Sequence, residues 1–179
     1  MTAPALVLLG VSGAGKTTIG RLLAELLDAP LAEADDRVEA AAGASVADLV
    51  IALDPRLPDL RRSAAAEVLA QDGAIATLGP SQIEDPDTAA RLRAAKEAGA
   101  RVVELVADTA EVARREGLNR PRSVGLGAPR ALLATMIRSL HEKYADVADS
   151  SVETGGRDPR EIAEEIAREC RLAGDSPNP

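Results

Sequence analysis

Short segments that favour β-strand alternate along the chain with longer segments that favour α-helix. The first strand segment, residues 5–9, is continuously apolar, which is typical of a strand buried on both faces of a parallel sheet. Further strands are predicted at residues 31–33, 74–78, 101–107 and 150–153. Each is separated from the next by a segment long enough for a helix, as crossover connections between parallel strands require.

The helical segments have apolar residues at a spacing of three and four. The clearest one follows the first strand, ends before Pro30, and has apolar residues at Ile19, Leu22, Leu23, Leu26 and Leu27. Residues 36–71 are predicted to be helical in pieces, with interruptions at Gly43, Pro55 and Pro58. Further helices are predicted at residues 87–99, 109–117, 130–147 and 159–172.

This alternation predicts one three-layer α/β/α domain over residues 1–173, with a five-stranded parallel sheet and helices on both faces. Neither an internal repeat nor a linker divides it. Residues 118–129 are basic and rich in Gly and Pro without any periodicity, which indicates a mobile loop. Residues 174–179 are predicted to be a disordered tail.

The composition narrows the kind of core and the kind of partner. Of 179 residues, 46% are hydrophobic, yet there is no Phe or Trp and one Tyr, so aliphatic side chains must fill the interior. The lack of aromatic residues disfavours base stacking, and a net charge of -8 disfavours a surface that follows phosphate backbones. Nucleic acid is therefore not an expected partner.

Neither a disulfide nor a membrane segment is expected. Cys170 is the only cysteine, and it follows Ile162 and Ile166 at helical spacing, so we interpret it as a buried structural thiol. No apolar run approaches the ~20 residues needed to span a bilayer. The apolar stretch at residues 4–10 lacks the basic flank of a signal peptide. We therefore expect a cytoplasmic protein.

The strongest chemical signal lies between the first strand and the first helix, where residues 10–17 read GVSGAGKT. Its glycines allow the backbone to curl so that successive N–H groups point at bound phosphates, at the positive end of the next helix. Lys16 can reach the β- and γ-phosphates, and the Thr17 hydroxyl can bind magnesium. Because a buried strand precedes the motif and an amphipathic helix follows it, we interpret it as a P-loop for ATP. The predicted nucleotide-binding residues are Gly10, Ser12, Gly13, Ala14, Gly15, Lys16, Thr17 and Thr18.

Carboxylates gather at the end of the second predicted strand, at Glu33, Asp35 and Asp36. Ligands of an open parallel sheet bind beyond the carboxyl ends of its strands. A carboxylate there can hold magnesium through water, and another can accept a hydrogen bond from an attacking hydroxyl. The alternative is that Asp35 or Asp36 is the N-cap of the next helix, and one residue can do both.

Arginines supply the cations that phosphoryl chemistry needs. Arg120 and Arg122 lie in the Gly/Pro-rich segment, which suits a lid at about residues 117–129 that closes over phosphates and neutralises charge. Arg61 and Arg62 lie on a predicted helix, where an arginine by itself is most often a solvated surface residue.

Together these elements resemble the shikimate kinase family, whose members have the P-loop fold of the nucleoside monophosphate kinases. The resemblance runs from residue 6 to about residue 167. Its motifs are EAD at 33–35, GASVADL at 43–49, LRR at 60–62, TLG at 77–79, RP at 120–121, KYADVA at 143–148 and DP at 158–159. It implies a substrate-binding helical segment at about residues 34–71, in addition to the lid.

The resemblance also implies an activity: transfer of a phosphoryl group from ATP, with Mg²⁺, to a hydroxyl of shikimate in chorismate biosynthesis. The residues that it implies at the site are Lys16, Asp35 and Arg120 for catalysis, Thr17 and Glu33 for the metal, Asp35, Arg61 and Gly79 for the acceptor, and Arg114 and Arg157 beside the adenine. Arg61 would pair with the carboxylate of the acceptor.

Two positions on the acceptor side depart from the family pattern. Pro80 lies in a turn where the family has glycine, and proline has no N–H to offer a substrate. Leu140 lies four residues before Tyr144, where the family has a second arginine for the acceptor carboxylate. Arg138 is two positions earlier, about 200° away around a helix, so it cannot simply replace that arginine.

Three functions are therefore left open. The first is a shikimate kinase, and the second is a related kinase for another polyol or sugar acid, such as gluconate. The third is a nucleotide-binding protein that has lost phosphoryl transfer. For a kinase, the expected partner is a small-molecule hydroxy acid, and by resemblance the protein is expected to be a monomer without nucleic-acid or membrane partners.

Overall fold

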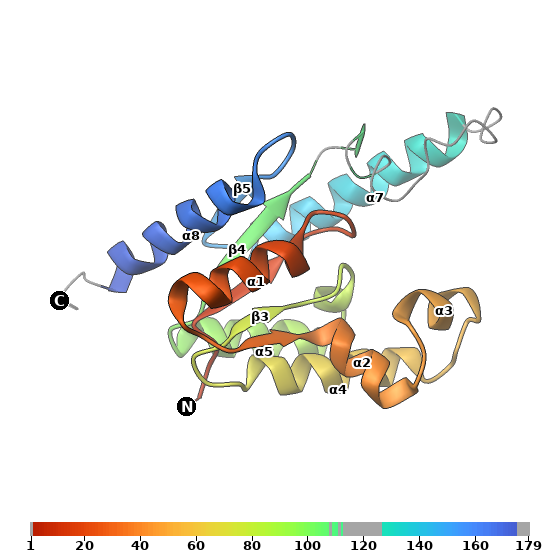
Figure 1. Cartoon of the computed structure of the whole chain (residues 1–179). Coiled ribbons are helices and arrows are strands. Elements are labelled where there is room, and N and C mark those ends of the chain that lie inside the picture. The colour runs from red at the N-terminus through yellow and green to blue at the C-terminus, as the bar shows by residue number, and fades with distance from the viewer. Residues whose placement is uncertain (1, 108, 111, 113–126, 175–179) are drawn as a thin grey trace.

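The computed structural model of the protein describes residues 2–107, 109, 110, 112 and 127–174 (Figure 1). Within these residues the predicted α/β fold is confirmed, because all five predicted strands are present and parallel. They are β1 (Leu6–Leu9), β2 (Leu31–Glu33), β3 (Ile75–Thr77), β4 (Arg101–Val106) and β5 (Ser150–Glu153).

The strands lie in the order β2-β3-β1-β4-β5, so β1 is the central strand. Leu8 of β1 is in register with Thr77 of β3 and Val103 of β4. Since all pairs are parallel, the carboxyl ends of the strands lie along one edge of the sheet. The segments that follow β1, β2 and β3 therefore begin side by side, and these segments hold the residues predicted to act on phosphate and acceptor.

The helices cover both faces of the sheet. They are α1 (Lys16–Leu27), α2 (Ala34–Ala42), α3 (Val46–Ile51), α4 (Leu57–Leu69), the short 3₁₀ helix η1 (Gln82–Glu84), α5 (Pro86–Glu97), α7 (Gly127–Ala145) and α8 (Pro159–Gly174). α1 and α8 pack together on one face, while α4 and α5 pack together on the other (Figure 1). No helix of the described residues is long and apolar enough to cross a membrane.

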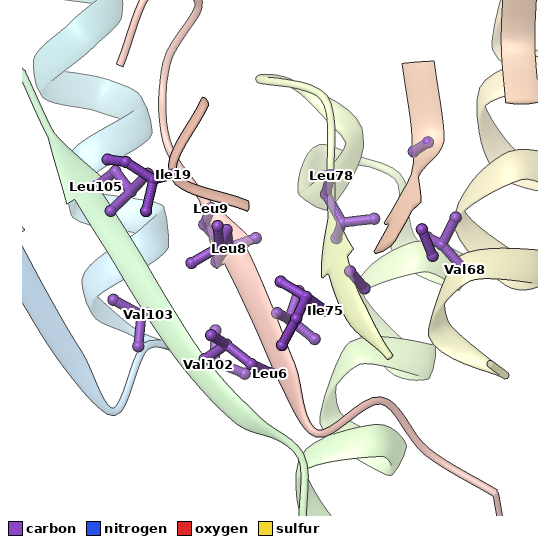
Figure 2. Close-up of a cluster of buried hydrophobic side chains, with 14 of the residues drawn as sticks. Leu6, Leu8, Leu9, Ile19, Val68, Ile75, Leu78, Val102, Val103 and Leu105 are labelled. Atoms are coloured by element: carbon purple, nitrogen blue, oxygen red, sulfur yellow. The ribbon is translucent and has the colours of Figure 1, made fainter. Parts of the chain in front are cut away.

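The core is aliphatic, as the composition predicts. All four residues of β1 are buried, as are Val102 and Val103 of β4. Figure 2 shows the side chains of Leu6, Leu8, Leu9, Val102 and Val103 in one cluster with those of Ile75 and Leu105. The ring of Tyr144 is also buried, so the single aromatic residue of the sequence lies in the interior.

Several predicted boundaries were wrong. α7 begins at Gly127 rather than at residue 130, so Pro129 lies in the first turn of a helix, where its missing N–H costs no intrahelical bond. Pro58 likewise lies in the first turn of α4 and does not interrupt it. α8 ends at Gly174, a residue predicted to be in the tail. The proposed helix at residues 109–117 lies largely outside the described residues.

Cys170 also differs from its prediction, because it is half-buried at the edge of the core rather than fully buried. Its desolvation still raises the pKa of the thiol, which keeps it protonated near neutral pH. A structural thiol therefore remains consistent with its environment.

Candidate active site

The P-loop joins the carboxyl end of β1 to α1 and has the geometry that its glycines predict. Gly13 and Gly15 have positive φ angles of 74° and 96°, in the region that side chains other than glycine rarely adopt. At Gly10, a Cβ atom would lie 2.7 Å from the carbonyl oxygen of Leu105. The tight passage past β4 therefore needs glycine, and Gly15 is the N-cap of α1, whose positive end points into the loop.

A cavity of about 400 Å³ opens at the start of α1. It is lined by residues 12–19, by Asp35 and Pro80, and by Thr154, Arg157, Pro159 and Ile162. Seven of the eight P-loop residues predicted to bind nucleotide line it, while Gly10 forms the start of the loop. The structure thus brings the P-loop together with residues that follow β2, β3 and β5 along the sequence.

Lys16 lies over its own loop. Its Nζ donates hydrogen bonds to the carbonyl oxygens of Gly10 at 2.8 Å and Val11 at 3.1 Å. The side chain is half-buried and lines the cavity. Its charge is therefore held at the mouth of the loop, beside the positive end of α1.

Asp35 lies in the first turn of α2, directly after β2. The N-cap of this helix is Glu33, so the alternative interpretation of Asp35 or Asp36 as the N-cap was wrong. The Oδ1 atom of Asp35 is buried and has no hydrogen-bond partner. Burial raises the pKa of this carboxyl group, and the nearby charges of Lys16 and Arg61 oppose that rise. A buried oxygen without a partner is costly unless a ligand pairs with it.

The turn after β3, residues 79–81, contacts Asp35 from the other side. A Cβ atom on Gly79 would lie 2.8 Å from Oδ1 of Asp35, so glycine leaves the space that the carboxylate occupies. The Gly79 N–H donates a hydrogen bond to the side-chain oxygen of Gln82, and this bond orients the turn. Gln82 in turn donates to the carbonyl oxygen of Arg61 at 2.9 Å. The Gly79 amide is thus bonded within the protein, although the residue itself lies against Asp35.

Arg61 reaches this turn from α4. Its Nη1 donates to the Ser81 hydroxyl at 3.4 Å, and its buried Nε has no hydrogen-bond partner. The neighbouring Arg62 instead pairs with Asp85 at 3.0 Å and with Asp59 at 2.9 Å, away from Asp35. Of the two adjacent arginines, Arg61 therefore has the buried nitrogen without a partner, and it lines a neighbouring cavity with Ser81 rather than the cavity that contains Asp35.

The predicted metal pair is only partly brought together. Thr17 lines the cavity, whereas Glu33 is buried at the end of β2 and does not line it. Glu33 is 3.9 Å from Nη2 of Arg21 on α1. It therefore lies against α1 and not in the cavity lining. Among the described residues, no group of three or more His, Cys, Asp or Glu could hold a metal ion.

Arg157 borders the end of the cavity formed by β5 and α8. Its Nη1 donates to the carbonyl oxygen of Glu153 at 3.2 Å, and its Nη2 pairs with Glu165. Thr154 and Ile162 line the same end and were missed by the sequence reasoning, because nothing in their local pattern marks them. Arg114, Arg120 and the remainder of the proposed lid up to residue 126 lie outside the described residues.

Comparison with known proteins places these features in a family. The shikimate kinase family model matches residues 12–171. The shikimate kinase of Thermobifida fusca is 39% identical over 173 residues, 96% of this chain and 98% of that protein. The shikimate kinase of Streptomyces avermitilis is 34% identical over 167 residues, 93% and 95% of the two chains.

Solved structures agree in fold. A shikimate kinase from Acinetobacter baumannii in complex with shikimate has a TM-score of 0.79 at 23% identity, covering 98% of this chain and 96% of that chain. A gluconokinase from Sinorhizobium meliloti has a TM-score of 0.62 at 24% identity, covering 97% and 95%. The family model begins within the P-loop and includes Lys16, Asp35 and Arg61, and the relatives span nearly the whole chain. With its phosphate loop and carboxylate at one cavity, the chain therefore belongs to the shikimate kinase family of small-molecule kinases.

Proposed function

We propose that this protein transfers the γ-phosphoryl group of ATP to a hydroxyl group of shikimate, a reaction of chorismate biosynthesis. The observation that carries the proposal is the buried, unpartnered Oδ1 of Asp35 at the cavity that the P-loop lines. This oxygen can accept a hydrogen bond from the acceptor hydroxyl and orient it toward the phosphate.

Charge at the site supports the same reaction. The charges of Lys16 and Arg61 both act on the Asp35 carboxyl group, where they oppose the rise in its pKa that burial causes. Lys16 would stabilise the negative charge that spreads over the transferring phosphoryl group. Arg61 would pair with the carboxylate of the acceptor, since its Nε is buried and unpartnered. We expect Arg120 to add a cation when the proposed lid closes, and Arg114 and Arg157 to flank the adenine.

The donor set suits Mg²⁺, which would enter with the nucleotide. Magnesium keeps several waters and is usually held by few protein oxygens together with phosphates. The Thr17 hydroxyl lines the cavity, and the buried Glu33 carboxylate lies behind it on the same side of the sheet as α1. Thr17 would hold the ion directly and Glu33 through water, and the ion would supply neutralisation of the phosphate charge.

One assay tests the proposal. ADP release is measured with ATP and Mg²⁺ in the presence of shikimate, of gluconate, or of buffer alone. Saturable turnover with shikimate supports the proposal. Turnover with gluconate alone would mean that gluconate, and not shikimate, is the acceptor. ATP binding without turnover on a broad panel of polyols and sugar acids, in a protein that melts cooperatively, would contradict phosphoryl transfer and leave a nucleotide-binding protein.

The proposal also includes the location, the oligomeric state and the partners of the enzyme. We expect a cytoplasmic monomer that acts on a small hydroxy acid, without nucleic-acid or membrane partners. Family resemblance and the acidic net charge of -8 support this expectation. Size-exclusion chromatography with light scattering checks the monomer, and a dimer mass would contradict it.

A further inference from the structure

A second cavity lies beside the phosphate cavity and differs from it in chemistry. Its volume is about 300 Å³, and it shares Ser12 and Pro80 with the cavity that contains Asp35. The rest of its lining is apolar: Val11, Val112, Leu133, Met136, Ile137 and Leu140. A small molecule whose hydroxyl group reaches Asp35 can therefore contact an apolar surface on the far side of Pro80.

One face of α7 forms most of this surface, which we name the apolar wall: Leu133, Met136, Ile137 and Leu140. These positions differ by three or four, so their side chains project from the same side of the helix. Arg138 projects elsewhere and lines a different cavity together with Glu104 and His141. Among the described residues, no Lys or Arg lines the cavity of the apolar wall.

Polar contacts hold the apolar wall in place. The Tyr144 hydroxyl donates to the carbonyl oxygen of Pro80, which fixes α7 against the turn after β3. One turn of helix earlier, Nδ1 of His141 lies 2.7 Å from Oε1 of the buried Glu104 on β4. Lys143 pairs with Glu84 of η1. The wall is therefore fixed relative to Pro80 without any ligand.

The opposite side of the same turn is cationic. Arg61 contacts Ser81, and its charge acts on Asp35 together with that of Lys16. The turn at residues 79–81 thus contacts two kinds of surface, because Arg61 meets it at Ser81 in a neighbouring cavity and the apolar wall meets it at Pro80. A ligand that fits both has one anionic group and, at another edge, carbon atoms without hydroxyl groups.

We infer that the acceptor site is amphipathic and that Leu140 and Met136 determine its specificity through contact with an apolar edge of the acceptor. This inference rests on the proposed function and adds the substrate class: hydroxy acids with an unsubstituted carbon edge. The ring of shikimate has such an edge in its methylene group. Gluconate, which has a hydroxyl group on every carbon beyond its carboxylate, does not.

The test is a kinetic comparison of matched leucine variants of the full chain. Leu140→Ala is expected to raise KM for shikimate about tenfold, the factor that corresponds to losing most of a leucine contact. KM for ATP is expected to stay unchanged. Leu132→Ala, at a leucine of the same helix that is 63% exposed and outside the cavity, is expected to change neither value. Leu140→Met keeps the apolar volume and is expected to stay within about twofold of the wild type.

Since Leu140 also packs against the core, its truncation can impair folding. Met136→Ala is a second variant that is not expected to impair folding, because Met136 is 54% exposed yet lines the cavity. It is expected to raise KM for shikimate about threefold. Unchanged KM for shikimate in both Leu140→Ala and Met136→Ala, as in Leu132→Ala, would overturn the inference.

A failure of the proposed function is distinguishable from a failure of this inference. If wild-type protein turns over no shikimate, the proposed function fails. The apolar wall is then tested by the binding of anilinonaphthalenesulfonate, a probe with one anionic group and apolar rings. In a fluorescence titration, we then expect Leu140→Ala to bind this probe about tenfold more weakly than Leu132→Ala does. Equal binding by the two variants would overturn it.

Discussion

Replacing Gly79 with alanine tests whether the position of Asp35 controls phosphoryl transfer. The added Cβ would lie 2.8 Å from Oδ1 of Asp35 and 3.2 Å from Oε1 of Gln82. Ordinary van der Waals contact begins at 3.4 Å, so the carboxylate must retreat by about 0.6 Å, which is 3.4 minus 2.8. The φ angle of Gly79 is not in the left-handed region, so the effect comes from the contact and not from backbone strain.

The expected loss follows from this displacement. A misplacement of 1 Å at a reacting group commonly costs ~100-fold in rate, so a shift of roughly half that distance predicts about a tenfold lower kcat. KM for ATP is expected to be unchanged, because the atoms nearest to the added Cβ belong to Asp35 and Gln82 and not to the P-loop. Steady-state ADP release with shikimate and with ATP as the varied substrate measures both values.

Gly73→Ala is the matched control. Gly73 precedes β3 at the opposite edge of the sheet, has a φ angle of 65°, and has no atom within 4 Å of an added Cβ. The left-handed backbone makes alanine destabilising by about 1 kcal/mol without touching the site. We expect a lower melting temperature with wild-type kinetics. Wild-type kcat in Gly79→Ala would refute the reasoning, as would an equal loss of kcat in Gly73→Ala.

Three further changes test the rest of the site. In Asp35→Asn, kcat should fall at least ~100-fold. Burial raises the pKa of Asp35 in the folded protein, so the folded state loses stability as the pH rises from the ordinary pKa to the raised one. At pH 7 the asparagine side chain, which carries no charge, should therefore increase the melting temperature. Tyr144→Phe removes the donor to the Pro80 carbonyl, which should cost about 1 kcal/mol, or roughly 3 °C in melting temperature, and raise KM for shikimate but not for ATP. Lys16→Ala should abolish ATP binding in calorimetry, and unchanged nucleotide affinity would contradict the role of Lys16 in the P-loop.

The geometry of the P-loop could be predicted from the sequence because its determinants are contiguous. The residues at 10–18 form one motif whose glycines are required by local geometry, and the structure has them in that geometry. Asp35 could be predicted because it follows a strand directly, and the ends of parallel strands converge. In each case, the information lies within a few residues of the functional side chain.

The region proposed to bind the acceptor depends on contacts between residues that are distant in the sequence. The pattern showed that Pro80 lacks an N–H, but not that Gln82 binds the Gly79 amide and the Arg61 carbonyl oxygen. Nor could it show that Tyr144 reaches Pro80, because that contact depends on the packing of α7 against β4 and the turn. Such long-range pairings decide the shape of a pocket and have no local signal.

The hydrogen bond between Tyr144 and Pro80 has a spectroscopic consequence. Tyr144 is the only aromatic residue in the sequence, so the whole near-ultraviolet absorption, circular dichroism and intrinsic fluorescence of the protein come from one buried ring. The hydroxyl group of that ring donates a hydrogen bond to Pro80, which lines both the P-loop cavity and the cavity of the apolar wall. The unmodified protein therefore contains a single optical probe at the proposed acceptor site, and an acceptor that shifts this turn can be followed without any attached label.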